Sequence, residues 1–173
     1  MRHSYPFDRS SGILLHPTSL PSPFGIGDFG PEAFRFVDFL ALADQTLWQI
    51  CPLGPTGYGD SPYQALSSVA GNPMLISLQR LLETGLLTAD ELGSAEHAVG
   101  TVDYGRVQNQ HWPLLNQAFQ RFLSAASTLE QHRFQRFCER NGSWLNDFAL
   151  FMVLKSERGG APWYEWEEEF KFR

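Results

Sequence analysis

The chain has 173 residues, of which 43% are hydrophobic and 14% aromatic, and its formal net charge is −6. This length and hydrophobic content suit a globular domain that buries a core. The acidic balance, without any basic run, argues against binding to nucleic acid or to an anionic membrane surface. Cys51 and Cys138 are too few for a disulfide framework or a metal cluster, so two free thiols in a reducing compartment are expected.

The start of the chain does not resemble a targeting segment. Residues Met1 to Ser11 are polar, and the first apolar run, Gly12 to Leu15, is short. A secretory signal or a membrane-spanning helix needs a longer apolar stretch. We therefore expect a cytoplasmic protein that does not associate with membranes.

The first part of the chain has the pattern of a strand, a helix and a second strand. Gly12–Leu15 and Leu47–Cys51 are continuous apolar runs, which predict buried strands of a parallel sheet. Between them, Pro31 and Glu32 favour a helix start, because proline fits the first turn and an acid suits the positive end of the helix dipole. This order predicts a βαβ unit of an α/β fold.

From Leu78 onward the sequence predicts helices instead of strands. A short helix is expected at Leu78–Glu83, ended by Gly85, and another begins near Thr88. Val102–Gly105 is interpreted as a turn or a short extended piece, and a helix carrying Leu115 follows it.

Two further helices follow. The stretch Thr128-Leu129-Glu130-Gln131 fits a capping box for the first of them. Ser143 is the expected cap of the second, which should end at Gly159-Gly160.

Two strands cannot make a closed barrel or a doubly wound sheet, and a complete (β/α)8 barrel needs about 250 residues. The chain also stops within an aromatic and acidic stretch, Trp163–Arg173, that carries no capping or stop signal. We therefore expect the front of a longer protein. The alternative is a small, self-sufficient α/β domain.

The stretch Leu53–Gln64 is the candidate ligand site. It follows the second predicted strand, and ligands of α/β folds bind at the carboxyl ends of parallel strands. A tyrosine ring offers a flat apolar face, while carboxylates and amides hydrogen bond to hydroxyl groups. No Lys or Arg occurs between Asp44 and Arg80, so a neutral polyhydroxylated ligand suits the stretch better than a phosphate. The candidate binding residues here are Tyr58, Asp60, Ser61, Tyr63 and Gln64.

His16 directly follows the first predicted strand, so it should open onto the same edge of the sheet. Hydrogen bonding to the ligand and hydrogen bonding to nearby backbone are both compatible with this position. A Ser/His/Asp triad assembled from His16, Ser61 and Asp60 would lack the G-x-S-x-G turn that presents a serine nucleophile.

Two other signals are weaker. The segment Gly25–Gly30 matches G-x-G-x-x-G, but nine residues separate it from the strand and Ile50 stands where a ribose-binding acid is expected, so no dinucleotide cofactor is predicted. His97, His111 and His132 are isolated from one another and are expected to be solvated. We predict neither a metal site nor any cofactor.

Taken together, several segments resemble the 4-α-glucanotransferases, also called amylomaltases or disproportionating enzymes, of glycoside hydrolase family 77. The strongest likeness lies in Gly12–Pro21 and in Trp48-Gln49 followed by Pro52–Gln64. The likeness continues through Gly71-Asn72-Pro73, Val102–Gly105, Asp147–Met152 and Pro162-Trp163, and so covers nearly all of the chain.

The resemblance implies a (β/α)8 TIM barrel of which this chain holds the first two strands, with a mostly helical insertion after the second strand. Residues 1–77 would be the start of the barrel with its sugar-binding loop, and residues 78–173 a helical insertion subdomain. The implied activity is the transfer of α-1,4-glucan segments between malto-oligosaccharides or to glucose, with retained configuration. The family's catalytic carboxylates come from later strands, and none of those motifs occurs here.

The resemblance also implies roles for individual residues. Tyr63 would stack against the sugar ring beside the scissile bond, with Ser61 and Asp60 near it, and Tyr58 would belong to a second glucan platform. Gln108 stands where an aromatic partner of Tyr58 occurs in some relatives. The expected partner is a malto-oligosaccharide or a starch- or glycogen-derived glucan. The alternative function is a non-catalytic glucan-binding or interaction module left by truncation.

Overall fold

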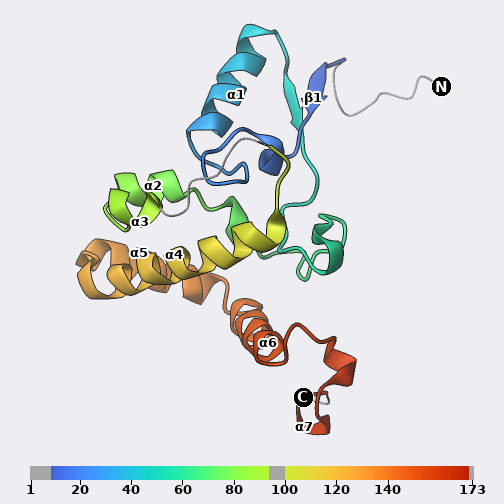
Figure 1. The fold of residues 1–173 in the computed structure, drawn as a ribbon, viewed down its shortest axis with the longest axis vertical. Helices are drawn as coiled ribbons and strands as arrows, with labels where there is room; N and C mark the ends of the chain where they lie inside the picture. Colours follow the sequence, from blue (N-terminus) through green and yellow to red (C-terminus); the bar gives the residue numbers. More distant parts are fainter. Residues whose placement is uncertain (1–8, 94–99, 172–173) are drawn as a thin grey trace, which may run out of the picture. The chain divides into compact units, whose positions relative to one another are not determined.

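The computed structural model describes residues 9–93 and 100–171 (Figure 1). The chain divides into two compact units, one ending at Ala125 and the other beginning at Ala126, and each is described by itself. The strands and α-helices of the first unit are β1 (Gly12–Leu14), α1 (Pro31–Leu42), β2 (Leu47–Gln49), α2 (Leu78–Glu83), α3 (Ala89–Gly93) and α4 (Tyr104–Ala125). Its 3₁₀ turns are η1 (Pro17–Ser19), η2 (Tyr58–Asp60) and η3 (Pro73–Leu75). The second unit contains α5 (Thr128–Arg140), α6 (Leu145–Glu157), η4 (Trp163–Glu165) and α7 (Glu168–Lys171).

The two strands pair in parallel, with Gly12 opposite Leu47 and Leu14 opposite Gln49, which confirms the predicted βαβ unit. The backbones approach so closely that a Cβ at Gly12 would lie 2.4 Å from the carbonyl oxygen of Leu47. Glycine is therefore the residue that fits this position. The strands are shorter than the apolar runs that predicted them, and they end at Leu14 and Gln49.

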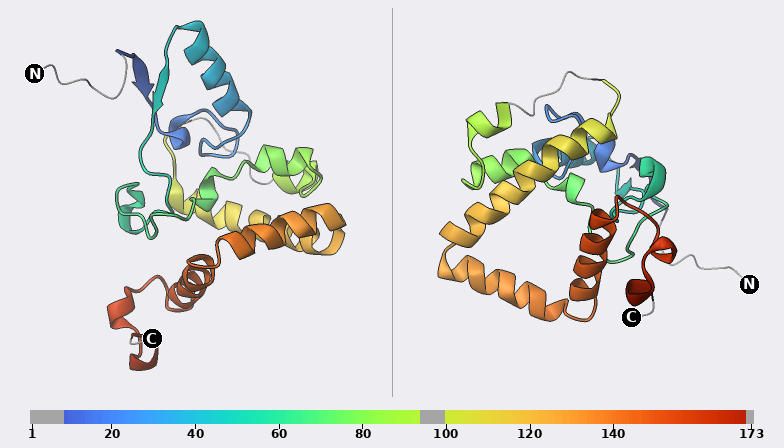
Figure 2. Two further views of the ribbon diagram at one scale, coloured as in Figure 1. Left: turned by 180° about the vertical axis from the view of Figure 1, so that it is seen from behind. Right: turned by 60° about the horizontal axis from the view of Figure 1, so that its bottom comes forward.

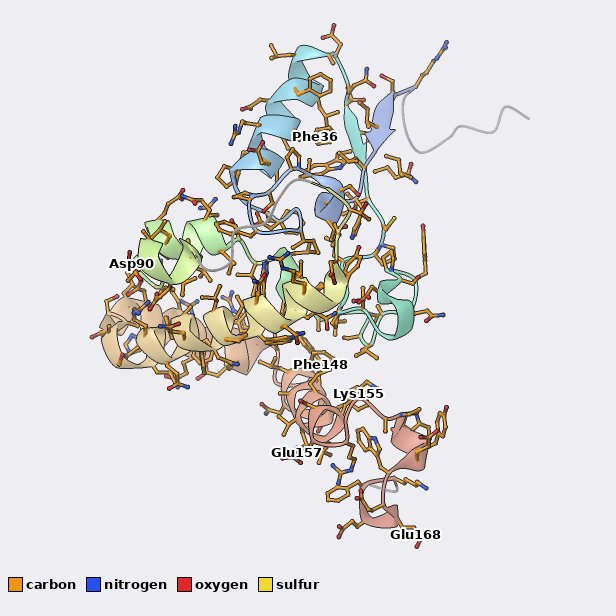
Figure 3. All side chains as sticks on the ribbon, viewed as in Figure 1. Phe36, Asp90, Phe148, Lys155, Glu157 and Glu168 are labelled. Atoms are coloured by element: carbon orange, nitrogen blue, oxygen red, sulfur yellow. The ribbon has the colours of Figure 1, made fainter. Side chains whose placement is uncertain are left out.

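Helix α1 packs on the strands through aromatic contacts. Phe36 projects from α1 toward the strands (Figure 3), and its ring centroid lies 5.0 Å from that of Trp48 in an edge-on arrangement. The indole Nε1 of Trp48 also donates a hydrogen bond to the carbonyl oxygen of Leu15 at 2.7 Å. A single side chain on β2 thus joins the helix to the end of β1.

The prediction that the strands are buried, and that α1 is covered on most sides, is wrong for the described part of this chain. Leu14 and Leu47 are 60% and 55% exposed, and Leu42 on α1 is 87% exposed. The physical reason is that a single helix covers only one face of the two-stranded sheet. The other face of the sheet and the outer side of the helix stay open to solvent. The other large apolar side chains of α1 that remain exposed are Phe34, Val37 and Phe39.

The main hydrophobic core lies away from the strands, among α2, α3, α4 and the loop that precedes α1. Phe24 from that loop packs with Leu78 and Leu87, which are almost completely buried. Leu92 of α3, and Leu114 and Ala118 of α4, complete this cluster. Both views in Figure 2 place α2 and α3 beside α4, which agrees with these contacts.

A second cluster fixes the first half of α4. Val107 is completely buried against Ile26 and Met74. The helix begins at Tyr104, so the predicted turn at Val102–Gly105 ends two residues sooner than expected. The reason is local, because the Asp103 carboxylate accepts a hydrogen bond from the backbone N–H of Arg106 at 3.0 Å and so caps the first turn.

An ion pair connects α3 with α4. The two terminal guanidinium nitrogens of Arg121 donate to the Glu91 carboxylate, at 2.7 and 3.1 Å, and Gln117 donates to the same carboxylate. The hydrogen bonds from Arg121, followed by the one from the backbone N–H of Thr88, lower the pKa of Glu91 to about 2. Arg121 also donates to the carbonyl oxygen of Leu86 at 2.5 Å, so one side chain joins three segments.

In the second unit, the helix caps differ from the predicted ones. The capping box of α5 uses Ser127 and Glu130, one residue earlier than the predicted Thr128 and Gln131. Ser143 is not the cap of α6, because Trp144 occupies the N-cap position without a side-chain cap. The predicted end of α6 is confirmed: Gly159 and Gly160 have positive φ angles of 61° and 82°.

Lys155 and Arg158 bind the segment after α6 to that helix. Figure 3 shows Lys155 on α6 of the second unit, and its Nζ donates to the carbonyl oxygen of Gly160 at 2.7 Å. Arg158 lies over the Phe170 ring at 4.3 Å and pairs with Glu167 at 2.7 Å. None of the helices within the described ranges has the length and apolar character needed to cross a bilayer.

Truncating Leu78 should destabilise the first unit strongly, because this side chain is completely buried in the main cluster. We expect Leu78→Ala to lower the free energy of unfolding by about 2–5 kcal/mol. Leu42→Ala is the matched control, and since Leu42 is 87% exposed its effect should stay within about 0.5 kcal/mol. Urea denaturation of both variants measures the difference. Equal effects would contradict the placement of the core.

The Glu91–Arg121 pair should make stability depend on pH. Because folding lowers the pKa of Glu91 from 4.5 to about 2, the contribution of this carboxylate is present above pH 4.5 and is lost as the pH falls toward 2. Glu91→Gln should therefore show a smaller fall in thermal midpoint than the parent chain between pH 5 and pH 3, measured by circular dichroism. Glu32→Gln removes a carboxylate from an ion pair with an exposed arginine, Arg35, and should behave like the parent.

Candidate functional site

The loop between residues 56 and 65 is closed at its base by backbone hydrogen bonds. Thr56 and Ala65 form an antiparallel bridge, and the N–H of Gly57 donates to the carbonyl oxygen of Gln64 at 2.9 Å. A Cβ at Gly57 would lie 2.9 Å from that same oxygen, so the close approach favours glycine. The result is a compact loop whose two ends are fixed to each other.

The tip of the loop turns through two consecutive residues with positive φ angles, Gly59 at 69° and Asp60 at 54°. Aspartate is one of the few non-glycine residues that adopt this left-handed conformation, because its short side chain accepts hydrogen bonds locally. The backbone then returns through a hydrogen bond from the Gln64 N–H to the carbonyl oxygen of Ser61 at 3.0 Å. The sequence predicted turns here but not this conformation at Asp60.

Tyr63 stands out from the loop and is 76% exposed. It borders a hollow of about 420 Å³. Its hydroxyl lies 3.9 Å from the Sγ of Cys51, and this thiol raises the pKa of the tyrosine above its ordinary value. The ring therefore presents an accessible apolar face with a neutral hydroxyl at pH 7. The hollow is lined by Pro52, Leu53, Gly54, Pro62, Tyr63, Ala65, Ser67 and Ser68.

Ser61 and Gln64 lie on either side of Tyr63 in the loop, and they differ in whether the side chain or the backbone is hydrogen-bonded. The Ser61 Oγ accepts a hydrogen bond from the N–H of Tyr63 at 3.3 Å, which leaves the hydroxyl proton available to another acceptor. The Gln64 side chain is exposed, while its backbone N–H donates to Ser61 and its carbonyl oxygen accepts from Gly57. Both side chains therefore belong to the same ordered loop as Tyr63.

Asp60 connects the loop to a distant part of the first unit. Its Oδ1 accepts a hydrogen bond of 3.1 Å from the side-chain amide of Gln108 on α4, 48 residues later in the sequence. Sequence reasoning noted Gln108 only as the residue standing where some relatives have an aromatic side chain. No periodicity or motif signals this contact.

His16 is partly buried at the end of β1, and burial lowers its pKa, so the imidazole is neutral at pH 7. Its Nδ1 has no hydrogen-bond partner among the described residues. Nearby backbone therefore does not satisfy Nδ1 within the described structure, and hydrogen bonding of His16 to the ligand stays a prediction. Because β1 and β2 are parallel, His16 and the segment after Gln49 leave the sheet at the same edge. Among the described residues, the side chains of Asp60, Ser61 and Tyr63 bond to Gln108, to the Tyr63 N–H and to Cys51, and none of these bonds reaches His16.

The side chain of Tyr58 lies outside what the structure describes. Its place in a second glucan platform therefore stays a prediction. The position proposed for its aromatic partner is held by Gln108, whose amide is already bound to Asp60.

The Gly25–Gly30 motif has a structural role in the loop that precedes α1. A Cβ at Gly27 would lie 2.1 Å from the carbonyl oxygen of Pro17, which only a glycine avoids. The buried Asp28 carboxylate accepts a hydrogen bond from the Gly30 N–H at 2.6 Å, at the start of α1. Burial raises the pKa of Asp28, while the hydrogen bond from the Gly30 N–H opposes the rise.

The predicted solvation of His111 is wrong. This residue is completely buried, and its Nε2 lies 3.0 Å from the carbonyl oxygen of Phe24. The contact joins α4 to the loop before α1, across 87 residues of sequence. His97 lies outside the described residues. Within the described ranges, the acidic, histidine and cysteine side chains form no group of three able to hold a metal ion.

Comparison with known proteins identifies the family. Residues 15–173 match the 4-alpha-glucanotransferase family. The chain is 49% identical over 166 residues to a 4-alpha-glucanotransferase of Synechocystis, covering 95% of this chain and 33% of that protein. It is 50% identical over 158 residues to one of Thermus thermophilus, covering 91% of this chain and 31% of that protein.

A solved structure agrees with these sequence matches. The amylomaltase from Streptococcus agalactiae in complex with acarbose superimposes with a TM-score of 0.85 at 39% identity, over 93% of this chain and 32% of that one. The chain thus spans about a third of the length of the relatives it matches. With the family match running through almost the whole sequence, the chain belongs to the 4-alpha-glucanotransferases of glycoside hydrolase family 77.

Proposed function

We propose that this chain supplies glucan-binding residues of an enzyme that transfers α-1,4-glucan segments between malto-oligosaccharides or to glucose. The observation that carries the proposal is the ordered loop that presents Tyr63, 76% exposed, beside Ser61 and Asp60. The family membership supports the reaction class, and a solved member was obtained in complex with acarbose.

In this proposal the two parallel strands are the first two of a (β/α)8 barrel. Residues 1–77 begin the barrel, and residues 78–173 form a mostly helical insertion after the second strand. The parallel pairing of β1 with β2 across α1 is the unit from which such a barrel is built. The proposed boundary after residue 77 separates the barrel segment from the insertion. It differs from the boundary after Ala125, which separates the two compact units of the structure.

The roles follow from the chemistry of the side chains. The Tyr63 ring stacks on a glucosyl unit, while Ser61, Asp60 and Gln64 hydrogen bond to its hydroxyl groups. His16, neutral and with a buried Nδ1 that lacks a partner among the described residues, binds a further hydroxyl from the end of β1. Tyr58 belongs to a second platform. The partner is a neutral malto-oligosaccharide, and none of these roles needs a metal or a cofactor.

Retaining transfer needs two carboxyl groups about 5 Å apart, one as nucleophile and one as acid and base. The described loop holds a single carboxylate, Asp60, and its Oδ1 is bound to the uncharged amide of Gln108. We therefore assign the catalytic carboxylates to polypeptide that the relatives have in addition to the third matched here. This chain contributes substrate binding to the reaction and no catalytic carboxylate.

The 173-residue chain by itself should release no glucose from maltotriose. A chimera that joins it to the part of the Thermus thermophilus relative that this chain does not match should transfer glucan segments. Glucose release, measured enzymatically, compares the two proteins. Glucose release by the chain alone would refute the assignment of the carboxylates. Saturable heat on titrating the chain with maltoheptaose, with an inactive chimera, would instead favour a non-catalytic glucan-binding module.

Removing the Tyr63 ring should weaken transition-state binding. In the chimera, Tyr63→Ala should lower kcat/KM by about 2- to 12-fold, which corresponds to a stacking contact of roughly 0.5–1.5 kcal/mol. Tyr63→Phe keeps the ring and loses only the weak contact with Cys51 at 3.9 Å, so its kcat/KM should stay near the parental value. Val69→Ala, at another exposed position, controls for changes elsewhere on this surface. An unchanged kcat/KM in Tyr63→Ala would remove Tyr63 from the binding site.

A further inference from the structure

We propose that Gln108 is a positioning residue, which holds Asp60 and with it the loop of residues 56–65 in the conformation that receives the glucan. The inference rests on the proposed function for its biological meaning. The contact that carries it is the hydrogen bond of 3.1 Å from the Gln108 amide to Oδ1 of Asp60.

The loop needs a contact of this kind because the backbone hydrogen bonds at its base and from Gln64 to Ser61 all lie within the loop. The bridge between Thr56 and Ala65 and the hydrogen bond from Gly57 to Gln64 fix the two ends to each other. They do not connect the tip to the rest of the unit. The hydrogen bond from Gln108 does, since it joins the tip to a helix 48 residues away.

The conformation at the tip also needs support. Asp60 has a φ of 54° and follows Gly59 at 69°. A left-handed backbone at a residue other than glycine is unfavourable and persists where surrounding contacts determine it. The hydrogen bond from Gln108 forms while Asp60 has this left-handed backbone conformation. It therefore stabilises these backbone angles against other conformations of the turn.

Helix α4 is a rigid base for this contact. Val107, the residue next to Gln108, is completely buried against Ile26 and Met74. The Asp103 carboxylate caps the same helical turn through the N–H of Arg106 at 3.0 Å. Gln108 therefore projects from one of the best-anchored parts of the first unit.

The chemistry of the bond suits a binding loop. The amide is a neutral donor and does not compensate the Asp60 carboxylate, and a hydrogen bond to a carboxylate is stronger than one between neutral groups. Only Oδ1 is occupied, and Oδ2 has no hydrogen-bond partner among the described residues. One oxygen of Asp60 thus fixes the loop while the other is available to a hydroxyl of the ligand.

Hydrogen exchange of backbone amides in the 173-residue chain tests the positioning role without any glucan. Gln108→Ala should accelerate exchange at Gly57 and Gln64, whose N–H groups bond within the loop, by about 10-fold, because opening of the loop becomes easier. Exchange at Val107, whose N–H bonds to the carbonyl oxygen of Asp103 just before α4, should stay within about twofold. Asn109→Ala, an exposed amide on the same helix, is the matched control and should leave all three rates unchanged.

Exchanging the carboxylate and the amide between positions 60 and 108 distinguishes a positioning role of Gln108 from a general structural role. Gln108→Glu places two carboxylates in contact and should also accelerate exchange in the loop. The Asp60→Asn/Gln108→Glu double variant forms the bond again with donor and acceptor exchanged, so its rates should return to within about threefold of the parent. Unchanged loop exchange in Gln108→Ala, equal acceleration at Val107, or no rescue by the double variant would each overturn the proposal.

The consequence for glucan binding is read in the chimera described above. Gln108→Ala should raise the KM for maltoheptaose several-fold and change kcat by less than about twofold, because the residue orders the loop and does not touch the reacting atoms. A parental KM would overturn the positioning role. If the parental chimera itself shows no transfer, the proposed function fails, whereas the exchange measurements on the chain are judged independently.

Discussion

The parallel pairing of β1 with β2 is the constraint from which the arrangement of the candidate site follows. Strands that run in the same direction end at the same edge, so the segments after them emerge side by side. Gly12 permits the close approach, because any larger residue would press a Cβ against the carbonyl oxygen of Leu47. The Trp48 indole then bonds to the carbonyl oxygen of Leu15, which fixes the point where the chain turns toward His16.

The stability of the first unit comes from a different region than its strands. The buried clusters join the loop before α1 to α2, α3 and α4, whereas the strands and much of α1 are exposed. His111 of α4 reaches the carbonyl oxygen of Phe24, and Val107 packs on Ile26. The helices after residue 77 therefore support the loops that follow the strands, and they pack with them in both hydrophobic clusters. The stability of the strand segment and of the helical segment is therefore shared, although the sequence pattern places a boundary between them after residue 77.

Local patterns in the sequence predicted the elements that depend on local chemistry. Pro31 begins α1, and α2 occupies Leu78–Glu83 as predicted, because proline, glycine and apolar spacing act within one or two turns. The errors arose where two local solutions compete or where a distant contact decides. Ser127 and Thr128 are both able to cap α5, and the structure selects the first, together with Glu130. The burial of His111 depends on a carbonyl group 87 residues away, which no local pattern reveals.

The contact between Asp60 and Gln108 shows why the candidate site was predicted only in part. The aromatic and polar residues of the loop were visible as a turn-rich stretch, but the anchor of its tip lies 48 residues later. Under the proposed function, a glutamine at this place changes how the loop would gain affinity. An aromatic side chain would add contact area for a second sugar, whereas an amide adds order to the loop proposed to bind the first one. Since ordering a loop during binding costs free energy, a loop ordered beforehand binds a neutral sugar more tightly without making any new contact with it. A cationic side chain in place of Gln108 would also hold Asp60, but it would compensate the charge of the carboxylate. The hydrogen bond that Oδ2 accepts from a ligand hydroxyl would then be weaker.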